Sequence, residues 1–318
     1  MILVTTKDMS PSQLNLLEKH AGDVEVTFQN NIHETASAVL EKVKVWITYG
    51  DDVQEAALGK LPHLEWLQIF QAGIENLPIS EIKKRGIFLT NMRQIHEIPM
   101  SEYALGMMLQ VNLNLHALRQ AQEKKHWDET ATIEELHGKN VCIFGAGTLG
   151  TAVAEKCKMM GMNVFGINTT GTIRPPFLEM EKLSDRNKLI VKSDFIILLM
   201  PATEETKNCI SHEEFKNMKK SAVFINMGRG QLVNEKALIE ALKAREIKAA
   251  VLDVVTEEPL PAENPLWSLD NVIITPHIAA QSPYYLDRCL SVFQKQWKNW
   301  LDNKKEAILY QIDLSKQY

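Results

Sequence analysis

The sequence has little that would support metal binding, disulfide bonding or attachment to a membrane. Its four cysteines lie far apart in 318 residues and form no CxxC pair. We therefore predict no metal site and no disulfide, and we expect a reducing, cytoplasmic location. The longest apolar runs, such as 195–200, have the length of a strand and fall short of the roughly 20 residues that span a bilayer. Residues 1–6 lack a preceding basic region, so we expect a strand there and no signal peptide.

The chain also has fewer basic than acidic residues. The chain has 35 Lys and Arg against 40 Asp and Glu, a net charge of −5, and no basic block. We therefore expect neither nucleic acid nor a membrane as a partner. The composition is that of a globular protein, with 45% hydrophobic and 24% charged residues, and the length predicts two domains.

Short apolar segments alternate with helical stretches over the first hundred residues. The expected strands are Ile2–Thr5, Val24–Phe28, Val43–Thr48, Leu67–Phe70 and Ile87–Leu89. Such alternation implies parallel βαβ units, so we predict an open α/β domain over residues 1–98. A helix after Pro283 is expected to pack back on it, and the chain ends in strand-like Ala307–Tyr310. Residues 284–318 would thus complete the first domain.

A long helical pattern opens at Pro99 and runs out at Lys124 and Lys125. Residues 126–139 then look like an arm or linker, with Trp127 near its start. The helix offers more apolar surface than one domain needs. We therefore predict a homodimer that buries a region of about 99–138.

A second alternating series begins at Asn140. The expected strands are Val141–Phe144, Val164–Ile167, Phe195–Met200, Ala222–Asn226, Ala249–Val255 and Val272–Thr275, and the expected helices are Leu149–Met160, Ser211–Lys219 and Asn234–Ala244. We assign residues 99–283 to a second α/β domain.

The first strand of this series runs directly into a GxGxxG motif that opens a helix, which is the context required of a dinucleotide-binding turn. Gly145 would allow the tight turn, Gly147 the close approach of a pyrophosphate, and Gly150 the packing of helix on strand. The helix N-terminus would supply N–H donors to the phosphates. The alternatives are a glycine-rich turn without a ligand and a methyltransferase-type turn.

The residue expected to meet the adenosine ribose is Asn168, where an acidic residue would favour NAD. Thr169 and Thr170 follow, and Arg174 is near. An uncharged, hydroxyl-rich loop with a cation beside it favours NADP. The alternative is a polar surface turn that still binds NAD.

Three polar residues each follow an apolar strand of the second series: Arg229, Glu258 and His277. The carboxyl ends of parallel strands converge on the ligand crevice. Arginine binds a planar carboxylate in a bidentate manner, and a His–Glu pair makes an acid/base group. Taken singly, each could be an ordinary loop residue.

Several segments carry a family resemblance. These are Phe144–Gly150, Leu199–Thr206, Ile225–Gly230, Leu252–Pro261 and Thr275–Ala279, with Gln71–Pro78 and Thr90–His96 in the amino-terminal part. In order and spacing they resemble the D-isomer-specific 2-hydroxyacid dehydrogenases. The resemblance implies two Rossmann-like domains, a flavodoxin-like substrate domain and a doubly wound dinucleotide-binding domain, with the active site in the cleft between them.

The resemblance also implies residue roles. Arg229 would bind the substrate carboxylate, His277 would donate a proton to the carbonyl, and Glu258 would hold His277. Backbone donors of Ala72 and Gly73 would bind the same carboxylate. The residues expected to contact the cofactor are Gly145, Gly147, Thr148, Leu149, Gly150, Asn168, Thr169, Thr170, Arg174, Pro201, Thr206, Met227, Gly228, Arg229, Asp253 and His277.

The leading hypothesis is a reductase that transfers a hydride from NADPH or NADH to a 2-oxo acid and forms a D-2-hydroxy acid, as glyoxylate and hydroxypyruvate reductases do. The alternative is a dinucleotide-sensing, corepressor-like binding protein of the same fold, in which partner contacts matter more than turnover.

Overall fold

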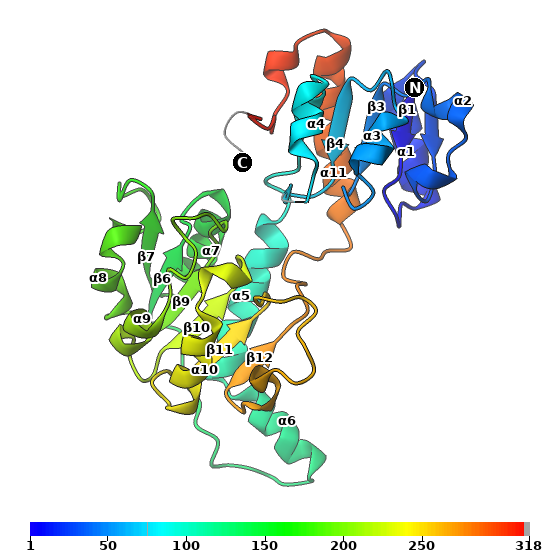
Figure 1. Ribbon diagram of the computed structural model, residues 1–318. Helices are drawn as coiled ribbons and strands as arrows, with labels where there is room; N and C mark the ends of the chain where they lie inside the picture. The colour runs from blue at the N-terminus through cyan, green and yellow to red at the C-terminus, as the bar shows by residue number, and fades with distance from the viewer. Residues whose placement is uncertain (75, 315–318) are drawn as a thin grey trace. The chain divides into compact units, whose positions relative to one another are not determined.

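The computed structural model describes residues 1–74 and 76–314, so residue 75 of the 71–78 motif and the last part of the 284–318 segment lie outside the described residues. The chain forms two compact units, Met1–Ile95 with Ser282–Tyr318 and His96–Gln281. The boundaries expected from the sequence, after residues 98 and 283, lie within three residues of these. Each unit is built around its own parallel sheet (Figure 1).

The first unit contains a five-stranded sheet in the order β2-β1-β3-β4-β5, the flavodoxin-like doubly wound order. Its strands are β1 Ile2–Val4, β2 Val26–Phe28, β3 Val45–Thr48, β4 Trp66–Ile69 and β5 Phe88–Thr90. Its helices are α1 Pro11–Ala21, α2 Ser37–Leu40, α3 Glu55–Gly59, α4 Ile79–Lys84 and α11 Tyr285–Leu301, with short 3-10 turns at Ile32–Glu34 and Lys305–Ala307.

Two apolar layers hold this sheet. On one face, α1 and α11 pack in a cluster in which Trp66 of β4 stacks on Phe293 of α11, with ring centroids 5.3 Å apart. On the other face, Leu58 of α3 and Ile82 of α4 are fully buried. The carboxy-terminal helix is therefore an integral layer of the amino-terminal unit.

The second unit contains a seven-stranded parallel sheet in the order β12-β11-β10-β9-β6-β7-β8. Counted from β6, this is the Rossmann order with one added strand. Its strands are β6 Asn140–Phe144, β7 Asn163–Asn168, β8 Glu179–Lys182, β9 Phe195–Leu198, β10 Val223–Asn226, β11 Ala249–Leu252 and β12 Val272–Ile274. Its helices are α5 Glu97–Asn112, α6 Leu115–Glu123, α7 Thr148–Met159, α8 Asn187–Ile190, α9 His212–Asn217 and α10 Glu235–Lys243, with 3-10 turns at Leu183–Asp185, Gly230–Leu232 and Pro265–Ser268.

Helices cover both faces of this sheet as well. Residues of α5 and α7 pack on one face, and residues of α8, α9 and α10 pack on the other. The predicted fold class, two Rossmann-like α/β folds, is confirmed. Among the described residues, no helix is both long and apolar enough to cross a membrane.

Two local predictions are wrong, and one strand was not predicted. The helix expected from Pro99 to Lys125 is two helices, because Asn114 adopts φ +49, a left-handed conformation that asparagine tolerates better than most residues. Strand β8 was missed, since Glu179–Lys182 is short and largely polar. The strand-like Ala307–Tyr310 contains no strand; the neighbouring Gln311 makes only a single bridge to Thr90.

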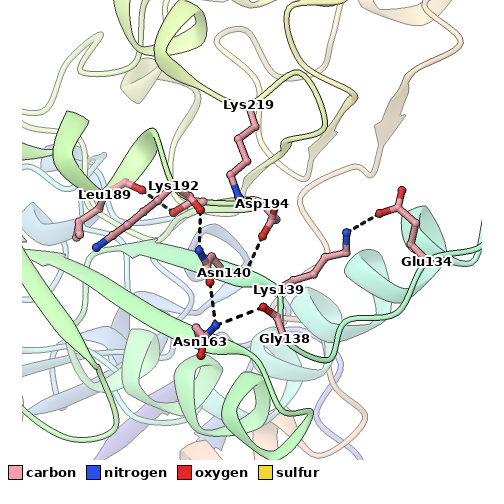
Figure 2. A network of polar contacts seen from close by, with 10 residues as sticks. Glu134, Gly138, Lys139, Asn140, Asn163, Leu189, Lys192, Asp194 and Lys219 are labelled. Atoms are coloured by element: carbon pink, nitrogen blue, oxygen red, sulfur yellow. Dashed lines mark hydrogen bonds and ion pairs between the residues drawn. The ribbon is translucent and has the colours of Figure 1, made fainter.

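A polar network ties together the amino ends of the second sheet (Figure 2). The Asp194 carboxylate before β9 accepts the Asn140 N–H of β6 at 2.9 Å and the Lys219 ammonium at 2.8 Å. The Asn163 amide of β7 donates to the Asn140 side chain at 3.0 Å. In a parallel sheet this edge lies opposite the carboxyl ends, so the network serves the sheet and leaves the other edge free for a site.

Candidate functional site

The carboxyl ends of the second sheet carry most of the predicted site residues. Because all its strands are parallel, the segments that follow β6, β9, β10, β11 and β12 emerge at one edge. The strand order reverses between β6 and β9, which is where open α/β sheets bind their ligands.

The glycine turn after β6 fits a dinucleotide. Gly145 has φ +91, and a Cβ there would lie 2.9 Å from the Leu199 backbone, so only glycine fits. A Cβ on Gly150 would lie only 2.4 Å from the Gly145 oxygen. Because glycine has no Cβ, α7 can start close to its strand. A Cβ on Gly147, by contrast, would meet open space. The backbone at the α7 N-terminus, with Thr148 and Leu149 as its first residues, is thus accessible to a phosphate.

The loop after β7 is organised by Asn168. Its side-chain oxygen accepts the Gly171 N–H at 2.6 Å and the Thr170 N–H at 3.0 Å. The Asn168 oxygen therefore stabilises the turn that follows it. Thr169 and Arg174 are exposed. No carboxylate stands where an NAD-selective loop would carry one.

Lys182, which was not among the residues predicted from the sequence, also lies at this loop. It ends β8, is exposed, and stands in register with Asn168 on the neighbouring strand. A Cβ on Gly171 would lie 3.3 Å from the Lys182 Cγ, so the lysine stem packs against the turn. Only recognition of β8 as a strand would have revealed this second cation.

The loop after β9 is held by Thr206. Its hydroxyl donates to the Pro201 oxygen at 2.8 Å and accepts the Thr203 N–H at 2.8 Å. Thr206 and Pro201 therefore belong to one closed loop, which lies at the carboxyl end of β9. Their cofactor contacts stay a prediction.

The turn after β10 places Arg229. The Asn226 side chain accepts the Gly228 N–H at 3.1 Å and donates to the Arg229 oxygen at 3.0 Å, while Met227 between them is buried. A Cβ on Gly230 would lie 2.0 Å from the Val255 oxygen, so the β10 and β11 ends touch through their backbones.

His277 and Glu258 meet directly. The His277 Nδ1 lies 2.8 Å from Glu258 Oε2, and Glu258 Oε1 accepts the Val255 N–H at 3.2 Å. A carboxylate can only accept, so Nδ1 carries the proton of this bond and Nε2 is left for another partner. Both side chains are partly exposed, at 49% and 38%, so the pair is open to a ligand.

Asp253, expected on the nicotinamide side of the site, follows β11 and bonds the segment after β12. The residue is 3% exposed, and its carboxylate accepts hydrogen bonds from the backbone of Ile278 and Ala279 and from the Thr275 hydroxyl. It holds the segment that carries His277. A direct contact with the cofactor stays a prediction.

The Ala72–Gly73 turn follows β4 in the first unit. Asn91 donates its side-chain N–H to the Ala72 oxygen at 2.7 Å, and Met92 N–H bonds the Gln71 oxygen at 3.0 Å. These bonds occupy carbonyl oxygens, which leaves the N–H side of the exposed Ala72 turn for an anion. Substrate binding here stays a prediction, as does the placement of the site in an interdomain cleft.

The described part of the chain, residues 1–74 and 76–314, contains no cluster of three or more His, Cys, Asp or Glu that could hold a metal ion. Its four cysteines are buried free thiols.

The chain is similar to known proteins of one family. Residues 105–279 match the family model of the D-isomer specific 2-hydroxyacid dehydrogenase NAD binding domain. A D-3-phosphoglycerate dehydrogenase of Methanocaldococcus jannaschii is 32% identical over 293 residues, which are 88% of this chain and 53% of the relative. The chain thus spans about half the length of that relative.

A glyoxylate reductase of Thermofilum pendens is 32% identical over 72% of this chain and 70% of its own length. Among solved structures, a D-isomer specific 2-hydroxyacid dehydrogenase family protein from Aeromonas salmonicida superposes with a TM-score of 0.88 at 29% identity, covering 98% of both chains. With its two doubly wound sheets, its GxGxxG turn and its His–Glu pair, the chain belongs to the D-isomer specific 2-hydroxyacid dehydrogenase family.

Proposed function

We propose that the protein reduces a 2-oxo acid to a D-2-hydroxy acid with NADPH or NADH. The observation that carries the proposal is the 2.8 Å contact between His277 Nδ1 and Glu258 Oε2 at the ligand edge of the dinucleotide-binding sheet. It produces an imidazole that is oriented by a carboxylate and has a free Nε2, the arrangement of a general acid.

Each site residue has a proposed role in the reaction. The bound dinucleotide would supply the hydride. Protonated His277 would donate a proton from Nε2 to the carbonyl oxygen, and Glu258 would balance the charge of the imidazolium. Arg229 would hold the substrate carboxylate through its planar guanidinium. In the oxidative direction, neutral His277 would accept the hydroxyl proton at the same nitrogen.

The choice of NADP over NAD rests on the loop after β7. Asn168 lacks the negative charge that repels a 2′-phosphate, and Arg174 and Lys182 add two exposed cations beside the turn. The site residues at the phosphates would be Gly145, Gly147 and Gly150, with the first N–H groups of α7.

For the substrate, we propose a small 2-oxo acid such as glyoxylate or hydroxypyruvate, held by Arg229 and by the Ala72–Gly73 turn. The relative from Thermofilum pendens named as a glyoxylate reductase supports this choice. We further propose a cytoplasmic homodimer that buries the 99–138 region. Three apolar residues in that region are exposed: Leu115, Trp127 and Ile133.

Steady-state kinetics with a panel of 2-oxo acids, each with NADH and NADPH, tests the proposal. His277→Ala should lower kcat by about 100-fold or more, the usual range for loss of a general acid. Arg229→Ala should mainly lower kcat/KM, because the substrate carboxylate loses its bidentate partner.

His212→Ala is the matched control, because His212 Nε2 lies 3.0 Å from Glu240 in a similarly exposed His–Glu pair that is not among the predicted site residues. It should keep wild-type turnover. Dinucleotide binding without turnover of any 2-oxo acid would favour the corepressor-like alternative, and near-normal kcat in His277→Ala would contradict the assignment.

A further inference from the structure

A chain of hydrogen bonds lies behind the His277 segment. The Tyr103 hydroxyl of α5 lies 2.6 Å from Thr275 Oγ1, which lies 2.6 Å from Asp253 Oδ1. Because a carboxylate only accepts, Thr275 donates to Asp253, and Tyr103 must then donate to Thr275. The direction of every bond in the chain is therefore determined.

Asp253, at the end of this chain, holds the backbone that follows β12. Its side chain accepts the N–H groups of Ile278 and Ala279, each at 2.9 Å, and its main-chain oxygen accepts the His277 N–H at 2.9 Å. Three successive N–H groups thus bond to one residue. These donors offset the free-energy cost of burying the Asp253 side chain away from water.

The His277 backbone requires this support. Its φ is +54, in the left-handed region that a non-glycine residue adopts only at an energetic cost. Conformations of this kind persist where the surrounding contacts over-determine them. If the Asp253 contacts loosened, the segment could relax, and the imidazole would leave its position.

Tyr103 supplies the outermost contact of the chain. It lies in the cluster that joins Ala104 and Met108 of α5 to Ala279, so the helix packs under the segment. Burial raises the pKa of the Tyr103 hydroxyl to about 12, and this group therefore stays a donor at any physiological pH.

We propose that Tyr103 is a positioning residue for the reaction: acting through Thr275, it fixes the Asp253 hydrogen bonds that hold His277 in its left-handed conformation. The proposal rests on the proposed role of His277. Tyr103 touches neither the imidazole nor Glu258 in any contact between described residues, so its effect reaches His277 only through the backbone.

The test compares Tyr103→Phe with Ser193→Ala in the full-length protein. Ser193 donates a buried hydroxyl bond of 2.7 Å to the Leu189 oxygen at the opposite edge of the sheet, so its loss is a matched control for stability. Hydrogen–deuterium exchange without cofactor reports on the 275–281 segment, and kinetics separate kcat from the KM values.

We expect Tyr103→Phe to speed exchange of the 275–281 segment and to lower kcat by about fivefold, the factor for one hydrogen bond of typical net strength, with the KM for the dinucleotide unchanged. Ser193→Ala should change neither. Thr275→Val should reproduce the Tyr103→Phe result, and Thr275→Ser, which keeps the hydroxyl, should restore wild-type values.

Exchange or kcat in Tyr103→Phe equal to that in Ser193→Ala would overturn the proposal. Should Tyr103→Phe fail to fold, the Thr275→Val and Thr275→Ser pair decides in the same way. The failure of the proposed function has a different signature: His277→Ala would keep its turnover, while the exchange of the 275–281 segment would still respond to Tyr103→Phe.

Discussion

At the scale of single residues, we propose that the loop after β7 selects between NADP and NAD. Aspartate at position 168 would accept hydrogen bonds from the ribose and repel a 2′-phosphate. The side-chain oxygen of Asn168 instead accepts hydrogen bonds from the Thr170 and Gly171 N–H groups. On this proposal, the selectivity for NADP would depend on the cations beside the turn.

We predict a lower dissociation constant for NADPH than for NADH, and a reversed order in Asn168→Asp. Lys182→Ala should weaken NADPH binding and leave NADH unchanged, because only the 2′-phosphate needs the ammonium. Lys158→Ala, an exposed lysine in the last turn of α7, is the control. Calorimetric titration measures all four proteins.

A tenfold preference of the wild type for NADH, about 1.4 kcal/mol, would contradict this reading of the loop. Arg174 and Lys182 would then be surface cations with no part in selectivity.

At the scale of secondary-structure elements, the network of Figure 2 anchors the amino ends of β6, β7 and β9. Asp194→Ala removes an acceptor from the Asn140 N–H and from Lys219. We expect a loss of about 1–3 kcal/mol in the free energy of unfolding, the usual effect of leaving a partly buried donor unpaired. Chemical denaturation measures it.

Turnover per folded molecule should remain unchanged in Asp194→Ala, because the segments that carry the proposed catalytic residues leave the opposite edge of the sheet. Lys220→Ala, next to Lys219 but exposed, should have no effect on stability. A fall in kcat without a fall in stability would show that the two edges are coupled.

The arm before β6 is tied to the same edge by Glu134, which bonds Lys139 and Lys248 (Figure 2 shows the first of these contacts). These bonds hold the pKa of the Glu134 carboxyl below its ordinary value of 4.5. A lowered pKa in the folded state stabilises the protein at pH values above the unfolded pKa, and this contribution is lost as the pH falls through the folded pKa.

We therefore predict that the free energy of unfolding falls more steeply below about pH 5 in the wild type than in Glu134→Gln. Denaturant titrations at a series of pH values measure the two slopes. Parallel curves would show that the Glu134 contacts add nothing to stability.

At the scale of the whole molecule, the exposed apolar residues of α6 and of the arm, residues 126–139, predict an interface with a second copy of the chain. Trp127 is 86% exposed, and Leu115 and Ile133 are 46% and 58% exposed. Burial of such side chains is a main source of the free energy of association. We predict a particle of twice the 36.1 kDa chain mass.

Light scattering at micromolar concentration should show this dimer for the wild type and a shift toward monomer for Trp127→Glu. Trp267→Glu alters another exposed tryptophan of the same unit and should leave the mass unchanged. A monomeric wild type would refute the predicted assembly.

Local pattern was sufficient for much of the fold. Apolar runs located eleven of the strands, because a buried parallel strand is apolar along its length. The apolar pattern did not reveal β8, which ends at Lys182. It also did not reveal the break at Asn114, where one residue in a left-handed conformation divides a continuous apolar pattern. Neither feature has a periodic signature.

The glycine turn and the polar residues at the strand ends could be predicted from local sequence, since both depend on residues adjacent in the chain. Which of these residues meet depends on the tertiary structure. It joined His277 to Glu258, turned the Asp253 carboxylate toward Ile278 and Ala279, and brought Tyr103 to a residue 172 positions away. Such contacts follow from strand order, register and helix packing, and these are settled by burial of the whole core.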